Sequence, residues 1–204
     1  MIRNIIFDIG DVLFEYRWRD MLKDHGLSPE DAERIGRHMF MSPYWNILDL
    51  GTESPEEILG HLSDCYPKEE VEIMDWFLHN AQLMHVARPK VWEELHHLKE
   101  KGYGIYLLSN YSKILLDKHL EGAPFLSDID GAVISYQVHR IKPDPDIYKI
   151  LLDKYDLKPE ECFFYDDRPA NTKGAEKLGI KTFTVPGQEE LIEHMKTWPR
   201  LENC

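Results

Sequence analysis

The sequence predicts an α/β fold in which a doubly wound parallel sheet is interrupted, after its first strand, by an all-α insertion. From about residue 90 onward, short apolar runs alternate with segments of helical periodicity, a pattern typical of parallel strands joined by crossover helices. Residues 15–84 carry helix signals only, and one isolated apolar run precedes them. We therefore expect an α/β core of residues 1–14 and 85–204, with residues 15–84 inserted as helices.

The first expected strand is the apolar run at residues 5–7, which fits a buried strand of a parallel sheet. The C-terminal region supplies the other strands and the helices between them. Residues 146–155, for example, place Ile147, Leu151 and Tyr155 on one face of a helix. In chain order we expect strands at 105–108, 132–135, 162–165 and 182–185, and helices at 113–120, 146–155 and 171–178.

Two Ser-Pro pairs mark helix starts within the insertion. Ser28 and Ser54 are each followed by Pro and then by acidic residues. This order places a hydroxyl at the N-cap, Pro at the first helical position and negative charge in the first turn. Gly26 and Gly51 stand where helices or turns would end. These signals predict about four helices and no strand in the insertion.

The composition indicates a globular protein of the reducing cytoplasm. Apolar residues make up 43% of the chain, which is ordinary for a globular domain. The three cysteines, Cys65, Cys162 and Cys204, are too few and too widely spaced for a disulfide framework or a zinc motif. We find no apolar stretch long enough to cross a membrane and no cleavable signal pattern. The formal charge of −13 argues against a nucleic-acid partner, although a local cation would admit a small anionic substrate.

Polar side chains stand at or just after the carboxyl ends of four expected strands. Taken singly, each has an ordinary explanation as a turn former, a helix cap or an exposed loop residue. Together they would meet at one rim of the sheet, where doubly wound folds bind their ligands. Three carboxylates at one rim repel one another unless a cation binds, and oxygen ligands favour a hard ion such as Mg²⁺. The residues are Asp8, Ser109, Asn110, Lys142, Asp166 and Asp167.

Four segments that carry these residues resemble the signature motifs of the haloacid dehalogenase superfamily of hydrolases. They are FDIGDV, LLSNYS, RIKPDPDIY and FFYDDRPANTKGA, and they occur in the family's order across nearly the whole core. The resemblance implies a Rossmann-like core with an α-helical cap, here residues 15–84, after the first strand. Within the superfamily, the segments are most similar to a bacterial sugar-phosphate phosphatase subgroup typified by glucose-1-phosphate phosphatase.

The resemblance implies a two-step phosphatase mechanism on a small phosphorylated metabolite. Asp8 is the expected nucleophile, which forms an aspartyl-phosphate that water then hydrolyses. Mg²⁺ is the expected cofactor, held by Asp8, the backbone carbonyl of Gly10 and Asp167, while Asp166 orients a metal-bound water. Lys142 is the expected catalytic cation. The residues expected to contact substrate or phosphate are Ser109, Asn110, Lys142 and Asp11.

One motif position departs from the family pattern. Phosphatases of the family usually carry a second Asp two residues after the nucleophile, where it protonates the leaving group, and this chain has Gly10 there, followed by Asp11. Three explanations stay open. Asp11 takes over part of the proton transfer, a cap residue or water does so, or the leaving group needs little help. A sugar 1-phosphate fits the third explanation, because its hemiacetal hydroxyl is a better leaving group than a simple alcohol.

Two other functions are weighed against the phosphatase. The 2-haloacid dehalogenases of the superfamily also lack the second Asp, but they use no metal, whereas this chain keeps Asp166 and Asp167. A catalytically silent phosphate-binding protein of the same fold is the other alternative. Two further segments each allow two interpretations. The residues that open the insertion either contact substrate or seal the hinge of the cap; they are Tyr16, Trp18 and Arg19. Residues 49–52 form either a substrate-selecting loop or a plain turn.

Overall fold

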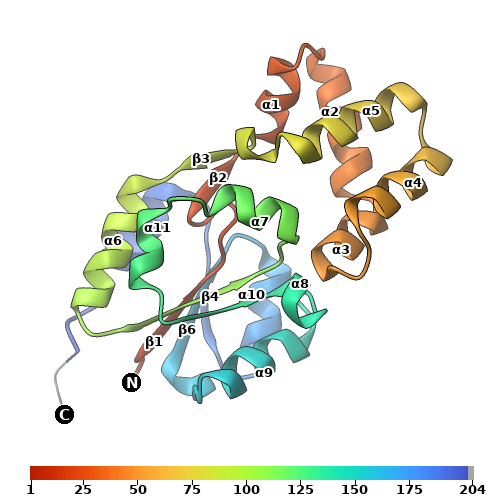
Figure 1. Cartoon of the computed structure of the whole chain (residues 1–204). Coiled ribbons are helices and arrows are strands. Elements are labelled where there is room, and N and C mark those ends of the chain that lie inside the picture. Colours follow the sequence, from red (N-terminus) through yellow and green to blue (C-terminus); the bar gives the residue numbers. More distant parts are fainter. Residues whose placement is uncertain (202–204) are drawn as a thin grey trace.

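The computed structural model describes residues 1–201, so Cys204 lies outside the described residues. Its centre is a five-stranded parallel sheet in the order β5-β4-β1-β6-β7 (Figure 1). This order confirms the predicted doubly wound fold, in which the first strand lies in the middle. The strands are β1 (Asn4–Phe7), β4 (Gly104–Ser109), β5 (Gly131–Ile134), β6 (Cys162–Asp166) and β7 (Lys181–Thr184).

Helices cover both faces of the sheet because successive strand side chains point to opposite sides. On one face, Ile5 and Phe7 pack in a cluster with residues of α6 and α11. On the other face, Ile6 packs in a second cluster with residues of α9 and α10. The core helices are α6 (Pro89–Glu100), α7 (Lys113–His119), α9 (Pro145–Lys154), α10 (Pro169–Glu176) and α11 (Gln188–Lys196), with shorter turns η2 (Pro124–Asp128), α8 (Ser135–Val138) and η3 (Pro159–Glu161).

The insertion contains five helices, one more than the sequence suggests. The additional start is at Ser42. Its hydroxyl accepts a hydrogen bond from the backbone N–H of Trp45, and Pro43 occupies the first helical position. Figure 1 shows these helices gathered beyond one end of the sheet. They are α1 (Trp18–Asp24), α2 (Pro29–Phe40), α3 (Pro43–Leu50), α4 (Pro55–Cys65) and α5 (Lys68–His79), followed by the short turn η1 (Ala81–Leu83).

The expectation of no strand within residues 15–84 is wrong. The chain enters the insertion through β2 (Phe14–Tyr16) and leaves it through β3 (His85–Ala87), and the two strands pair antiparallel. The pairing joins the two crossings between sheet and insertion and satisfies their backbone hydrogen-bonding groups. Buried Arg88 then donates from Nη1 to the carbonyl of Asp11 at 2.6 Å, which ties this ribbon to the loop after β1.

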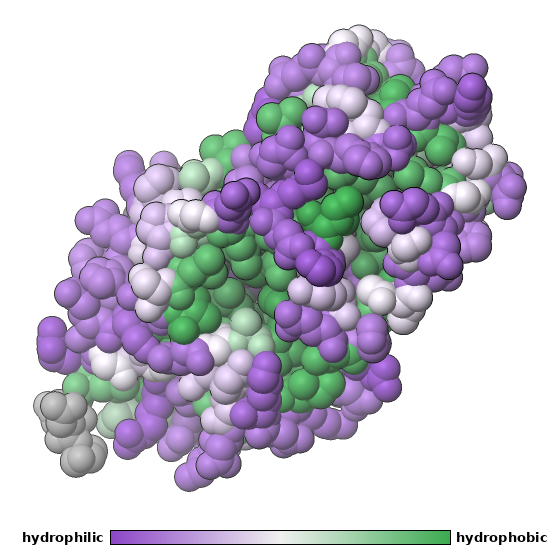
Figure 2. Space-filling model, viewed as in Figure 1, coloured by the Kyte–Doolittle hydropathy of each residue, from purple (hydrophilic) through white to green (hydrophobic). Residues whose placement is uncertain are grey.

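Much of the outer surface is hydrophilic. On the face seen in Figure 2, hydrophilic side chains cover much of both the inserted helices and the helices that flank the sheet. Within residues 1–201, no helix is both long enough and apolar enough to span a membrane. Of the two described cysteines, Cys65 is exposed, Cys162 is buried, and both are free thiols.

Candidate active site

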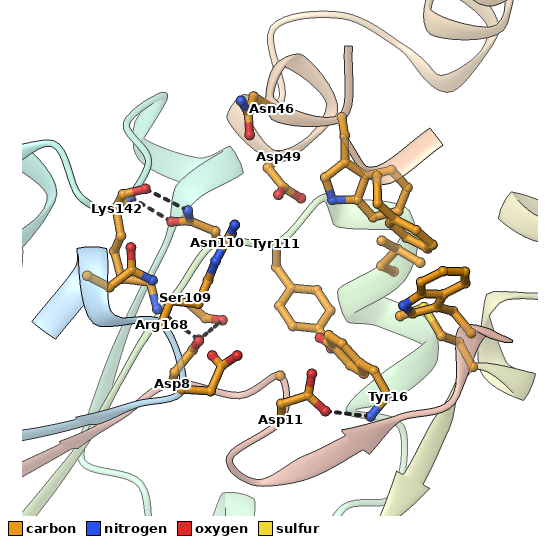
Figure 3. A pocket seen from close by; sticks show the side chains of 18 of the residues that line it. Asp8, Asp11, Tyr16, Asn46, Asp49, Ser109, Asn110, Tyr111, Lys142 and Arg168 are labelled. Carbon is orange, nitrogen blue, oxygen red and sulfur yellow. Dashed lines mark hydrogen bonds and ion pairs between the residues drawn. The ribbon is translucent and has the colours of Figure 1, made fainter. Parts of the chain in front are cut away.

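The carboxyl ends of β1, β4 and β6 border a cavity of about 450 Å³ that also reaches the inserted helices. From the sheet side it is lined by the predicted residues Asp8, Gly10, Asp11, Ser109, Asn110, Lys142 and Asp167, together with Arg168. Residues of the insertion complete the wall (Figure 3), among them Tyr16, Trp18, Trp45, Asn46 and Asp49. The fold therefore brings together the polar residues that the sequence placed at separate strand ends, with Asp166 buried directly beneath them.

Asp8 is a buried carboxylate whose Oδ1 is held by three donors. It follows β1, is 6% exposed, and continues the strand pairing through its backbone N–H, which donates to the Tyr165 carbonyl at 2.9 Å. Its Oδ1 accepts hydrogen bonds from Ser109 Oγ at 2.5 Å and from the backbone N–H of Ile9 at 2.8 Å, and Lys142 Nζ lies 2.9 Å away. Three donors on one oxygen fix the direction in which the carboxylate faces the cavity.

Lys142 is a fully buried cation between two carboxylates. Its Nζ donates to Asp166 Oδ2 at 2.7 Å and to the Leu108 carbonyl at 2.8 Å, in addition to its contact with Asp8. Burial alone would lower the pKa of this ammonium, but the charges of Asp166 and Asp8 outweigh burial and hold the pKa above its ordinary value. Lys142 is therefore charged at neutral pH, as a buried ammonium must be when it is paired on two sides.

Asn110 positions Lys142 through its side chain. Its Nδ2 donates to the backbone carbonyl of Lys142 at 3.0 Å, and its Oδ1 accepts from the backbone N–H of Lys142 at 2.7 Å. Both polar ends of the amide are therefore used in holding the lysine loop. The Asn110 side chain is thus directed at the Lys142 backbone, while the hydroxyl of the preceding Ser109 donates to Asp8.

Asp8, Asp166 and Asp167 form a group of carboxylates with the dimensions of a metal site. Each offers one oxygen that lies within 4.8 Å of the other two. Burial, then the charge of Asp8, then that of Asp166 raises the pKa of Asp167 to about 7, against the opposing charge of Lys142.

Asp166 differs from the other two carboxylates in being saturated with protein donors. Its oxygens accept from the backbone N–H of Arg168, from Lys142 Nζ and from Asn171 Nδ2, and the residue is completely buried. Among the three, Asp8 and Asp167 are the ones that line the cavity. Asp166 is placed to hold Lys142 and the β6–α10 turn rather than to face a ligand directly.

The space beside Gly10 is filled by Tyr16. A Cβ on Gly10 would lie 2.5 Å from Cε2 and 2.7 Å from the hydroxyl oxygen of Tyr16. Asp11 follows in a left-handed conformation with φ 52°, and its Oδ1 accepts a hydrogen bond from the backbone N–H of Tyr16 at 2.9 Å. Gly10 and Asp11 are therefore shaped around Tyr16, the last residue of β2.

The family model for haloacid dehalogenase-like hydrolases matches residues 2–179 of the chain. The chain belongs to this family. The match covers most of the chain, includes the four motifs and the insertion, and confirms that this protein is a haloacid dehalogenase-like hydrolase.

Known relatives of this hydrolase include a phosphatase. D-ribitol-5-phosphate phosphatase of Bacteroides thetaiotaomicron is 27% identical over 197 residues, which cover 90% of this chain and 91% of the relative. A predicted haloacid dehalogenase-like hydrolase from Porphyromonas gingivalis superposes with a TM-score of 0.72 at 27% identity, over 96% of this chain and 97% of the other. A family enzyme from Bacteroides thetaiotaomicron, solved with magnesium and inorganic phosphate, gives a TM-score of 0.69 at 25% identity, over 90% and 94% of the two chains.

Asp49 is a cavity residue that the sequence did not single out as a candidate site residue. It lies on the last turn of α3, is 8% exposed and lines the cavity. The sequence suggested only that residues 49–52 form a loop of uncertain use, because the direction of a side chain near a helix end depends on how the helix docks. The available signal was Gly51, whose left-handed φ of 65° ends α3 and turns the chain.

Proposed function

We propose that this hydrolase is a Mg²⁺-dependent phosphatase that cleaves a small phosphorylated metabolite through an aspartyl-phosphate on Asp8. One observation carries the proposal. A buried and oriented Asp8 carboxylate shares the cavity edge with Lys142 and Asp167, which are the cation and the second carboxylate that phosphoryl transfer requires there. The phosphatase relative with 27% identity supports the same conclusion.

In this mechanism the Asp8 carboxylate attacks phosphorus and displaces the alcohol, and water then cleaves the acyl phosphate to regenerate Asp8. Ser109 and the backbone at Asn110 bind the phosphoryl oxygens. Lys142 neutralises the charge that builds up between the nucleophile and the phosphate. Asp166 and Asn110 act on the reaction through Lys142, since both hold it by hydrogen bonds.

The donor set of the cavity edge fits a magnesium ion. Its oxygens come from carboxylates and carbonyls, which are the ligands of a hard cation, and the raised pKa of Asp167 marks a place where a positive charge would relieve repulsion. Asp8, Asp167 and the backbone carbonyl of Gly10 would hold the ion, with Asp166 behind them. When bound, the ion would reduce the repulsion between the Asp8 carboxylate and the phosphate and would polarise the phosphoryl group.

The substrate class follows from the size and lining of the cavity. A volume of about 450 Å³ suits a small metabolite, and Asn46 and Asp49 offer polar partners for hydroxyl groups. We propose a sugar or polyol phosphate, with a sugar 1-phosphate as the more specific hypothesis, and a cytoplasmic location. Residues 15–84 would act as the cap that closes over the phosphate ester and excludes water.

A phosphate-release assay with a substrate panel tests the function. With Mg²⁺ present we expect turnover of 4-nitrophenyl phosphate, glucose 1-phosphate and ribitol 5-phosphate, and loss of turnover when EDTA is added. Higher kcat/KM for glucose 1-phosphate than for glucose 6-phosphate supports the specific hypothesis, and equal values exclude it. Absence of phosphate release from every substrate by folded protein contradicts the phosphatase and favours a silent phosphate-binding protein.

A haloacid dehalogenase is the second candidate because Gly10 leaves no carboxylate at its position. Asp166 and Asp167 at the end of β6 weigh against a dehalogenase, because attack on carbon needs no metal site. Chloride release from 2-chloropropionate in the presence of EDTA, without phosphatase activity, would reverse the choice.

A further inference from the structure

The alcohol that leaves during phosphoester cleavage needs a proton, and Gly10 and Asp11 are poorly suited to supply it. Gly10 has no side chain, and the Tyr16 phenol fills the space where one would stand. The Asp11 Oδ1 accepts a hydrogen bond from the backbone N–H of Tyr16, which directs this carboxylate toward β2 (Figure 3), although burial raises its pKa. Burial holds the pKa of the Tyr16 phenol well above its ordinary value, so it is a weak acid.

Asp49 approaches the same cavity from the insertion. Figure 3 shows its carboxylate projecting from α3 into the cavity, across from Asp8. Displacement at phosphorus proceeds in line, so the leaving oxygen departs on the side remote from the attacking oxygen. With Asp8 as the nucleophile, that side faces α3 and Asp49.

The segment that carries Asp49 is fastened to the core of the protein. Ser135 Oγ donates to the Asp49 backbone carbonyl at 2.6 Å and accepts from the backbone N–H of Tyr111 at 2.8 Å. His139 Nδ1 lies 2.8 Å from the Leu50 carbonyl. Ser135 thus links the end of α3 directly to the loop after Ser109. These contacts fix the position of Asp49 relative to the phosphate-binding residues, as a catalytic group requires.

The surroundings of Asp49 favour a proton on its carboxyl group near neutral pH. Burial raises its pKa to about 7, against the opposing effects of the Ser112 backbone N–H and the charge of Arg168. The Asp8 carboxylate favours the protonated form, Lys142 opposes it, and the buried Tyr111 phenol is the other titratable group beside it. A carboxyl group of this kind can both give and take a proton at the pH of the cell.

We propose that Asp49, supplied by the inserted helices, is the general acid and base of this hydrolase; the inference rests on the proposed phosphatase function. As an Asp8 oxygen forms its bond to phosphorus, the ester P–O bond breaks, its electron pair goes to the leaving oxygen, and the Asp49 proton is transferred to that oxygen. The resulting Asp49 carboxylate then takes a proton from the water that attacks the aspartyl-phosphate. That step releases inorganic phosphate, frees Asp8 and restores protonated Asp49.

The test compares leaving groups in the variant Asp49→Asn. A primary alkyl phosphate such as ribitol 5-phosphate depends on protonation, so we expect its kcat to fall about 10²-fold or more. 4-Nitrophenyl phosphate differs, because its phenolate leaves without a proton. We expect its single-turnover rate constant for phosphoenzyme formation to change by less than about threefold. Glu53→Gln is the matched control, because Glu53 pairs with His61 on the insertion and does not line the cavity.

The outcomes separate this inference from the proposed function. Equal losses for the alkyl and aryl esters in the single-turnover formation of the phosphoenzyme, or a rise in KM with kcat unchanged, overturn Asp49 as the acid while the phosphatase stands. The wild-type kcat for the alkyl ester should fall as pH rises above the Asp49 pKa, and Asp49→Asn should lose that dependence; retention of the same profile also overturns the proposal. If the wild type releases no phosphate from any ester, both fall together.

Discussion

Gly10 and Tyr16 share one space beside the proposed nucleophile. The phenol lies where the side chain of residue 10 would begin, and the same tyrosine holds Asp11 through its backbone N–H. A side chain at residue 10 would require the Tyr16 ring to move. The loop after β1 and the last residue of β2 are therefore matched to each other.

Gly10→Asp is expected to destabilise the fold by about 1–3 kcal/mol through overpacking against the Tyr16 ring. Tyr16→Ala removes the obstacle, so the double variant should lose less stability than the sum of the two single changes. Urea unfolding of the wild type, both single variants and the double variant measures this interaction energy. Simple additivity would show that the ring does not limit residue 10.

Several site residues could be predicted from the sequence because each follows a buried strand. Asp8, Ser109 and Asp167 needed only the strand ends and the rule that parallel strands present them at one edge. Tyr16 and Asp49 could not be placed in this way. Their positions depend on how the insertion docks on the sheet, which is a tertiary property that no local pattern specifies.

At the level of elements, the junction between sheet and insertion is built from two short strands, β2 and β3. The strands of the parallel sheet are apolar runs, which made β1, β4 and β6 recognisable. β2 and β3 have three residues each, are partly exposed, and find each other only across the whole insertion, so their sequences carry no strand signal. Ser135 illustrates a similar limit, since it begins α8 instead of ending a strand.

Buried His119 ties α7 to the end of the insertion. Its Nε2 lies 2.7 Å from the Ala81 carbonyl, so that nitrogen carries the hydrogen, and its Nδ1 accepts from the Tyr111 hydroxyl at 2.7 Å. Burial, together with the nearby His85 and Lys118, lowers the pKa of His119 to about 4 from an ordinary 6.5. The neutral ring is therefore the form that stabilises the junction.

The stabilisation from His119 should be complete above pH 6.5 and should be lost as the pH falls towards 4, because the unfolded chain takes up the proton first. A difference of 6.5 − 4 = 2.5 pKa units corresponds to about 3 kcal/mol. His119→Gln removes this titration, so its free energy of unfolding should vary less between pH 7 and pH 4.5 than that of the wild type. Because the other buried acids titrate alike in both proteins, the difference in pH dependence reports on His119. Equal pH dependence of urea unfolding would contradict the low pKa of His119.

At the scale of the whole molecule, the cavity exists because two structures meet. The parallel sheet presents Asp8, Lys142 and Asp167 at its carboxyl edge, and the inserted helices supply the opposite wall with Asp49 and its neighbours. The net charge of −13 is unfavourable for an anionic substrate, but Asp8, Asp166 and Asp167 could hold a cation, which would attract such a substrate. Turnover in this cavity would therefore depend on phosphorylation of Asp8.

Direct detection of a phosphorylated Asp8 tests that chemistry. Wild-type protein would be mixed with Mg²⁺ and a radiolabelled phosphomonoester, quenched rapidly in acid, and digested so that protein-bound label can be located. We expect label on the peptide that contains Asp8, and neither label nor turnover in Asp8→Asn, whereas Asp117→Asn, which removes an exposed carboxylate paired with Lys113, should behave as the wild type. Turnover of the ester without protein-bound label, or wild-type turnover by Asp8→Asn, would contradict the account.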